Sequence, residues 1–353
     1  MDLSFTDEQD FLREAIRGMV EREAPLARVR EWVVDPPAAQ PAPSRALVVR
    51  QGWTGIGIAE ERGGQGGGTL ELAILAEELG RGAVPVDGLY ASLLAAIALS
   101  HAGGSDAEAL VAALADGESS AALVAPGDRP ADAPAAGRQA ALVLGAAAAD
   151  VLLGWDGEAL DVHQSGDAAV TARTMLDRTR SLADVDLPAP PSARIEGIDA
   201  EAMATVAATA AVVVAADALG AAQRLLDMTV AYVGQRTQFG VPVGSFQAVK
   251  HAAAEMLVAI EGTRAAVYYA AWAVGAREPG AALDACVAKL TAARAATLVA
   301  DRSLFLHGAV GYTWEHDLQL LFKRAKSDAL LFGGPDLYAD RIAGALELVP
   351  SRP

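Results

Sequence analysis

An arginine begins a short segment, residues 236–247, that has the composition of an anion-binding turn. The segment reads Arg236-Thr237-Gln238-Phe239-Gly240-Val241-Pro242-Val243-Gly244-Ser245-Phe246-Gln247. Its glycines and proline predict a bend between two helices, where an arginine offers a rigid fork to a phosphate or carboxylate. Phe239 and Phe246 would supply aromatic surface, and Gln247 could hydrogen-bond the edge of a ring. By itself the pattern also fits a surface ion pair beside core aromatics.

A second candidate is a glycine-containing bend that lies between two later expected helices. It reads Leu306-His307-Gly308-Ala309-Val310-Gly311-Tyr312-Thr313-Trp314-Glu315-His316-Asp317. Gly308 and Gly311 would let another backbone or a phosphate approach closely. The run 315–317 suggests a metal or acid–base site, but neighbouring residues of a helix point apart rather than converge. Capping and salt bridges are therefore the favoured role of its two carboxylates, and no metal site is predicted.

A glycine run at residues 63–68 is a weaker candidate for a phosphate-binding loop. Such a loop needs a preceding strand and a Lys-Ser/Thr pair at the start of the next helix, which this sequence lacks. We expect instead a flexible connection to a helix over residues 70–79, which Gly80 ends. The basic residues Lys323, Arg324 and Lys326 are expected to form a helix face that meets the helix's C-terminal end.

Three zones of different composition must position these segments. Residues 1–117 predict helices, the first of them preceded by a capping box of Thr6 and Gln9. Residues 118–198 predict a small β domain, because short apolar runs alternate with Gly, Asp and Pro. Residues 199–353 predict a four-helix bundle. The expected strands are Ala121–Val124, Ala140–Leu144, Val151–Trp155 and Ala168–Thr171, followed by a linker at 184–192, and the expected bundle helices are Ala202–Tyr232, Gly244–Val274, Ala281–Leu306 and Leu318–Leu331.

The fold class is therefore α+β and mostly α: an N-terminal helical domain, a small middle β domain and a C-terminal four-helix bundle. The 28 Lys and Arg against 45 Asp and Glu give a net charge of −17, which argues against nucleic-acid and anionic-membrane partners. The single cysteine, Cys286, excludes a disulfide framework and a Cys-rich zinc site. The first residues lack the features of a secretory signal, and the apolar run 202–219 contains Asp217. We expect a cytoplasmic protein in which this run is a buried helix.

Several of these segments together resemble the acyl-CoA dehydrogenase family. Residues 236–240 with Phe246-Gln247 resemble its Arg-x-x-Phe-Gly…Phe-Gln signature, and residues 307–318 are similar to its Gly-Gly-x-Gly-Tyr segment. Residues 63–67 with Glu77-Glu78-Leu79-Gly80-Arg81 match its N-terminal pattern, and residues 177–180 resemble the end of its middle domain. The matches follow the family's order over almost the whole chain. The Trp-Glu-His-Asp form of the second bend is typical of a subgroup of shorter members.

The resemblance implies a flavoprotein that desaturates an acyl thioester, carried by CoA or by a carrier protein. A carboxylate removes the α-proton while the β-hydrogen leaves as hydride to FAD. Carried over residue by residue, Arg236 would contact the FAD pyrophosphate of a neighbouring subunit, with Phe239 and Gln247 near the adenine–ribose half. Gly308 and Gly311 would let that half lie close to the backbone. The implied partners are an electron-transfer flavoprotein and a second subunit, in a homo- or hetero-oligomeric dimer or tetramer.

The carboxylate that acts as base in this family is replaced at both of its usual positions. One position, a Glu before Gly-Thr, corresponds to Phe332-Gly333-Gly334, and the other, a Glu in the helix before Arg236, corresponds to Ala210. Asp217 follows Ala210 by seven residues, which places it on nearly the same helix face about 10 Å further along. Asp217 is therefore the candidate catalytic residue, and pairing with a cation is the alternative.

Other departures concern the cofactor contacts. Phe305 stands where the family has Gln, Ala309 replaces a glycine, and the flavin-binding Thr-Glu-Pro…Gly-Ser motif is reduced to residues 124–128. Two hypotheses follow from the resemblance. The chain is either an FAD-dependent acyl-CoA dehydrogenase with an unusual base, or a non-catalytic partner subunit that completes the FAD site of a heteromeric enzyme.

Overall fold

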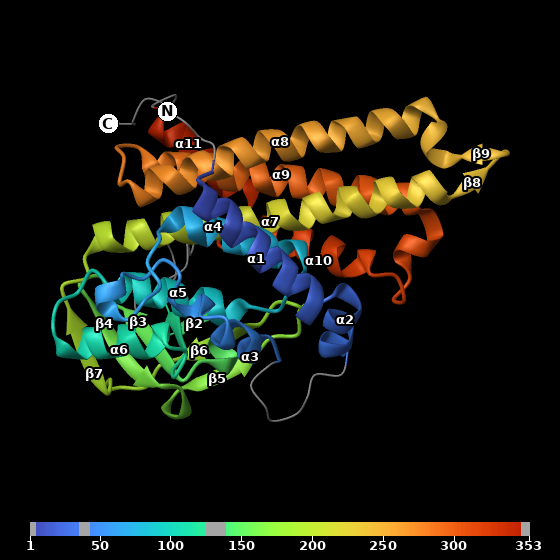
Figure 1. Ribbon diagram of the computed structural model, residues 1–353. Coiled ribbons are helices and arrows are strands. Elements are labelled where there is room, and N and C mark those ends of the chain that lie inside the picture. Colours follow the sequence, from blue (N-terminus) through green and yellow to red (C-terminus); the bar gives the residue numbers. More distant parts are fainter. Residues whose placement is uncertain (1–4, 35–42, 125–138, 347–353) are drawn as a thin grey trace. The chain divides into compact units, whose positions relative to one another are not determined.

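The structure, a computed structural model, describes residues 5–34, 43–124 and 139–346 of the chain. The polypeptide divides into two units whose segments alternate along the sequence (Figure 1). One unit comprises Met1–Glu31, Ala73–Val84 and Ala211–Pro353, and the other comprises Trp32–Leu72 and Pro85–Ala210. The first unit holds the long C-terminal helices, and the second holds the two larger sheets.

Long helices form the first unit, as their apolar, alanine-rich sequences predict. Helix α9 packs against α8, α10 and α11. In Figure 1 the axes of α7, α8 and α9 run in roughly the same direction. The N-terminal α1 and most of α4 belong to the same unit. The helices are α1 (Asp7–Glu23), α4 (Thr69–Arg81), α7 (Ala200–Gln235), α8 (Gln247–Gly275), α9 (Ala281–His307), α10 (Leu318–Leu330) and α11 (Pro335–Ala345), with α2 (Leu26–Val34) crossing the boundary between units.

Two glycines allow α4 and α7 to cross in direct backbone contact. A Cβ atom at Gly80 would lie 2.1 Å from the carbonyl oxygen of Asp217, and one at Gly220 would lie 1.8 Å from that of Glu77. No side chain fits at such distances, so only glycine permits this approach. The expectation that Gly80 ends its helix is therefore wrong: α4 continues to Arg81, and Gly80 is needed for the crossing.

The second unit packs short helices against two sheets. The four-stranded sheet has the order β1-β3-β4-β7, and the three-stranded sheet has the order β2-β6-β5. Helix α5 is buried along nearly its whole length and contacts β1, and its Ala91 joins a core formed with residues of both sheets. The helices are α3 (Pro43–Arg50), α5 (Asp87–Leu99) and α6 (Ser105–Ala115), and the strands are β1 (Ala121–Val124), β2 (Gln139–Leu144), β3 (Val151–Trp155), β4 (Ala159–Gln164), β5 (Ala169–Ala172), β6 (Leu182–Asp186) and β7 (Ala193–Glu196).

The expected fold class is confirmed, and the element boundaries show where sequence patterns suffice. Thr6 and Gln9 form the predicted capping box, and the four bundle helices lie within a few residues of their expected positions. Strands β4, β6 and β7 were not anticipated. Residues 184–186, expected in a linker, complete β6, because their partners for hydrogen bonding come from β2 and β5, which the local sequence does not reveal.

The glycine run is held by backbone hydrogen bonds rather than being a flexible connection. The amides of Gly57, Gln65 and Gly66 donate to the carbonyls of Gly66, Gly55 and Ile58, each at 2.8 Å. A Cβ atom at Gly64 would lie 2.0 Å from the Ile58 carbonyl oxygen. These glycines therefore make a tight loop against the preceding turn of the chain.

Among the described residues, α7 is one helix long and apolar enough to cross a membrane by length and composition. In its most apolar stretch, 83% of the residues are buried inside the protein. That burial accords with the prediction of a buried helix over residues 202–219.

Candidate functional site

Arg236 directly follows α7 and begins a small exposed hairpin. Strands β8 (Thr237–Gln238) and β9 (Val241–Pro242) pair, and the hairpin projects at one end of the helices in Figure 1. Phe239, at the turn with φ of 52°, is 92% exposed, and its ring meets that of Phe246 edge-on with centroids 6.3 Å apart. The interpretation of these two aromatics as core residues is therefore wrong. Gln247 is also exposed, at the first position of α8.

The guanidinium of Arg236 is available to a ligand. Its Cζ atom lies over the ring of Tyr232, 5.9 Å from the centroid. In the part of the chain that the structure describes, Arg236 has no carboxylate partner. An exposed guanidinium that is positioned by a ring and not neutralised can bind an anion without first breaking an ion pair.

The second bend lies next to the first. The ring of Tyr232 stacks on that of His307, the last residue of α9, with centroids 4.5 Å apart and an interplanar angle of 16°. The bend itself is a short 3-10 helix, η6 (Gly308–Tyr312). Gly308 has φ of 63°, and a Cβ atom there would meet nothing within 4 Å, whereas one at Gly311 would lie 3.0 Å from the Cβ of His307. Gly308 thus faces open space, whereas a side chain at Gly311 would be in tight contact with residues of this chain.

After this bend, Arg30 contacts the Asp317 carboxylate and the Glu315 backbone. Arg30 forms an ion pair with Asp317 at 2.5 Å and donates to the Glu315 carbonyl at 2.6 Å. The Nδ1 atom of His316 accepts from the Leu318 amide at 3.2 Å, near the start of α10. Over the described ranges, no three or more His, Cys, Asp or Glu side chains cluster to hold a metal ion.

Asp217, the candidate base, is enclosed within the first unit. Arg324 Nε and Nη2 donate to its two carboxylate oxygens at 2.8 and 2.7 Å, and Nη2 also donates to the Val84 carbonyl. Both side chains are 0% exposed. This is the cation pairing that the sequence left as the alternative. A carboxylate held by a two-pronged guanidinium and closed to solvent is poorly placed to accept a substrate proton.

The segment Phe332-Gly333-Gly334, the other position considered for a base, is also anchored internally. Lys289, which is buried, donates to the carbonyls of Asp328, Ala329 and Gly333 at 2.9 to 3.3 Å. The Tyr338 hydroxyl donates to the Phe332 carbonyl at 3.0 Å. These contacts fix the chain where α10 ends. Phe332 itself has φ of 59° and no group that can accept a proton.

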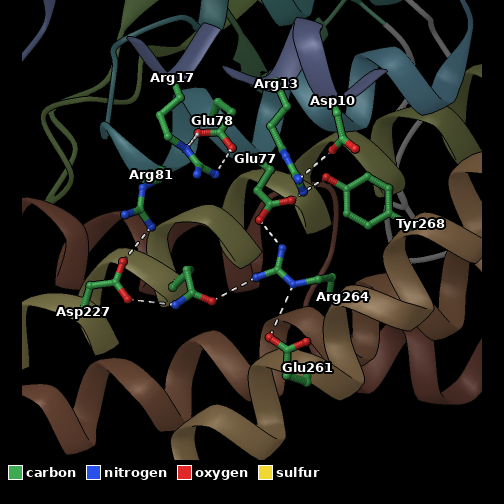
Figure 2. Close-up of polar contacts among 11 residues, drawn as sticks. Asp10, Arg13, Arg17, Glu77, Glu78, Arg81, Asp227, Glu261, Arg264 and Tyr268 are labelled. Carbon is green, nitrogen blue, oxygen red and sulfur yellow. Dashed lines mark hydrogen bonds and ion pairs between the residues drawn. The ribbon is translucent and has the colours of Figure 1, made fainter. Parts of the chain in front are cut away.

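A polar network joins α4 to α7 and α8 beside the glycine crossing (Figure 2). The carboxylate of Glu77, 4% exposed, accepts hydrogen bonds from Arg264 and from the Tyr268 hydroxyl. Arg264 continues to Gln223, which donates to Asp227, and Asp227 pairs with Arg81. Burial, and next the adjacent Glu77 carboxylate, raise the pKa of Tyr268 well above its usual value, so the hydroxyl stays protonated as a donor. Sequence analysis did not anticipate this network, because its members are far apart in the chain.

Comparison with known proteins places the fold and both bends in one family. Residues 6–118 match the acyl-CoA dehydrogenase N-terminal domain, and residues 200–346 match the acyl-CoA dehydrogenase C-terminal domain. Acyl-CoA dehydrogenase IpdE2 of Mycolicibacterium smegmatis is 33% identical over 94% of this chain and 96% of its own length. IpdE2 of Mycobacterium tuberculosis is 35% identical over 93% and 94%, respectively. The chain belongs to the acyl-CoA dehydrogenase family.

Solved structures agree with this assignment. A chain of the ChsE4–ChsE5 complex from Mycobacterium tuberculosis superposes with a TM-score of 0.88 at 26% identity, over 99% of this chain and all of the other. PigA with FAD and proline shares the fold, with a TM-score of 0.85 at 20% identity over 99% of this chain and all of the other. FAD is the cofactor of the family.

The surface around Arg236 and Gly308 fits a dinucleotide. A pyrophosphate needs a cation without an internal partner, an adenine ring needs apolar surface, and close approach needs a backbone without side-chain cover. Arg236, the exposed Phe239 and the open side of Gly308 have these properties. Of the reduced flavin-binding motif at residues 124–128, residues 125–128 lie outside the described residues.

Proposed function

We propose that this chain is the non-catalytic partner subunit of a heteromeric acyl-CoA dehydrogenase and that it completes the FAD site of a second chain. The observation that carries the proposal is a contrast of two charged side chains. Asp217 is paired with Arg324 inside the protein, whereas Arg236 is exposed without a carboxylate partner among the described residues. Arg236 is thus suited to binding the cofactor, whereas Asp217 is not placed to act as base.

The residues of this chain would bind and orient rather than transfer protons. FAD, when bound, accepts the β-hydrogen of an acyl thioester as hydride while a carboxylate takes the α-proton. Arg236 would hold the pyrophosphate, with Phe239 and Gln247 beside the adenine–ribose half and Gly308 allowing close approach. The carboxylate base would come from the second chain. An electron-transferring flavoprotein is the proposed electron acceptor.

Exposed apolar side chains around the two bends support an association with another chain. Phe239, Phe305 and Tyr312 are 92%, 77% and 71% exposed. Large apolar side chains gathered at one end of a protein favour burial against a partner. The resemblance to a chain of the ChsE4–ChsE5 complex supports a partner that differs in sequence, since that complex contains two kinds of chain.

Expression alone and with a partner tests the proposal. The partner to use is a dehydrogenase-like chain from a neighbouring reading frame that keeps the catalytic Glu. We expect this chain alone to be colourless and the co-purified complex to carry flavin that an acyl-CoA bleaches. Flavin on the chain alone, reduced by an acyl-CoA, would contradict the proposal and favour the other hypothesis, in which Asp217 acts as base.

Replacing Arg236 with alanine in the complex should weaken FAD binding by roughly 10- to 100-fold, because a charge-assisted hydrogen bond to an anion is worth about 1.5–3 kcal/mol. Flavin fluorescence during titration of the apo-complex measures the change. Arg302→Ala is the matched control, since Arg302 is an exposed arginine of α9 whose one ion pair, with Glu255, is long at 3.5 Å. Equal affinity of the Arg236 variant and the wild type would remove the cofactor assignment.

A further inference from the structure

We propose that His307 is a positioning residue: its neutral ring holds the Arg236 hairpin beside the Gly308 bend through Tyr232. The inference rests on the proposed function, in which these two bends bind one dinucleotide. It adds a residue that would act through Tyr232 rather than by contacting the dinucleotide. Protonation of this residue would weaken the binding of FAD.

A column of rings connects the two bends. The Arg236 guanidinium lies over Tyr232, and Tyr232 stacks on His307 with centroids 4.5 Å apart. The opposite neighbour of His307 is His316, which meets it edge-on at 5.1 Å and accepts from the Leu318 amide. The column therefore runs from the end of α7, past the end of α9, to the start of α10. Tyr232 has its ring plane set by His307, and Arg236 has its position set by Tyr232.

The hydrogen bonds of His307 define its protonation state. The Nδ1 atom lies 2.8 Å from the Ser303 carbonyl oxygen, which can only accept, so Nδ1 carries the hydrogen. The Nε2 atom is then an acceptor, and it is buried without a hydrogen-bond partner among the described residues. The side chain belongs to a residue only 3% exposed. The site thus accommodates a neutral imidazole and offers no acceptor to a second N–H.

Burial and the neighbouring cation disfavour protonation of the ring. Burial lowers the pKa of His307, the Ser303 hydrogen bond opposes this, and His316 lowers it further. On α7 the charged neighbour in the column is Arg236, which is also a cation. Beyond His316 lies Asp317, but Arg30 already pairs with it. A positive charge on His307 would therefore lack compensation and would disfavour the closed column.

The direction of the pH effect follows from the lowered pKa. The unfolded or opened state binds the proton more readily, with a pKa near the ordinary value of about 6.5. The column is therefore fully stabilised above that pH. Its stability falls as the pH drops below about 6.5 toward the lowered pKa of the closed state.

The test measures FAD affinity of the assembled complex by flavin fluorescence between pH 5 and 8. We expect the wild type to bind FAD several-fold more weakly at pH 5.5 than at pH 7.5. His307→Phe keeps a stacking ring that cannot be protonated, so its affinity should stay nearly constant over this pH range. His307→Ala should bind weakly at every pH. His251→Ala, at an exposed histidine of α8, is the control and should follow the wild type.

A wild-type pH profile in His307→Phe, or unchanged affinity in His307→Ala, would overturn the proposal. Hydrogen exchange of the hairpin amides at residues 237–243, corrected for intrinsic rates, gives a readout independent of FAD. The hairpin amides of the wild type should exchange faster in acid than at pH 7.5. At pH 7.5 they should exchange faster in His307→Ala than in the wild type. Both results are expected even if the proposed function fails. Equal exchange in all of these states would refute the positioning role. If His307→Phe does not fold, NMR titration of the His307 ring should coincide with the hairpin exchange, and separate midpoints would contradict the proposal.

Discussion

The middle and the end of α7 use charged residues in opposite ways. In the middle, Asp217 is fully buried and both of its oxygens are taken by Arg324. At the end, Arg236 is exposed and rests on Tyr232. A buried charge must be compensated by the protein itself, since leaving it unpaired is strongly unfavourable, whereas an exposed charge is solvated and remains available. Position on the helix therefore separates a charge that holds the fold from one that can bind a ligand.

The largest effect should come from breaking the buried pair. Asp217→Ala removes the two-pronged partner of the buried Arg324 guanidinium, which keeps the longer ion pair with Asp328 at 3.9 Å. We expect a loss of about 3–5 kcal/mol in the free energy of unfolding. Urea unfolding of the flavin-free chain measures it. If flavin reduction per folded complex persists in Asp217→Asn, the residue is structural. Abolished reduction with unchanged stability would instead identify it as the base.

A matched pair of glycine substitutions sharpens the same contrast. Gly220→Ala places a Cβ atom where the Glu77 carbonyl lies, so α4 and α7 must separate, at a cost of about 1–3 kcal/mol or more. Gly234→Ala, near the end of the same helix, meets nothing within 4 Å and should be neutral or stabilising by up to about 1 kcal/mol. Thermal unfolding of both variants compares them. Equal destabilisation by the two would show that the crossing is not as close as described.

The smallest effect on stability should come from Arg236 itself. Arg236→Gln removes no ion pair of the described residues, so the free energy of unfolding should change by less than about 0.5 kcal/mol. The same urea titration as for Asp217→Ala checks this. A loss comparable to that of Asp217→Ala would mean that Arg236 stabilises the fold. The contrast between Asp217 and Arg236 would then fail.

Features within one helix or strand could be predicted from the sequence where the interactions that form them join residues close in the chain. The capping box at Thr6 and the long apolar helices depend on residues a few positions apart. Strands β4 and β7 pair with each other although more than twenty-five residues separate their register partners. Such pairing depends on the partner strand more than on the segment itself.

The candidate site shows the same division. The residue types of both bends, including Arg236, Phe239, Gln247 and Gly308, were identified from their spacing and from the family resemblance. The stack of Tyr232 on His307 was not, because the two residues are seventy-five positions apart and neither motif indicates the other. Gly311 was assigned to cofactor approach, whereas its surroundings supply a packing reason within the chain.

The sequence by itself determined the family, the long bundle helices and some of the strands, because these follow from residue identity and short-range periodicity. Only the tertiary structure decided that Arg324 is a buried partner of Asp217, that Gly80 belongs to a helix crossing, and that His307 stacks on Tyr232. Each of these depends on which surfaces meet after the chain has folded back on itself. A single side chain or glycine does not encode its distant neighbour.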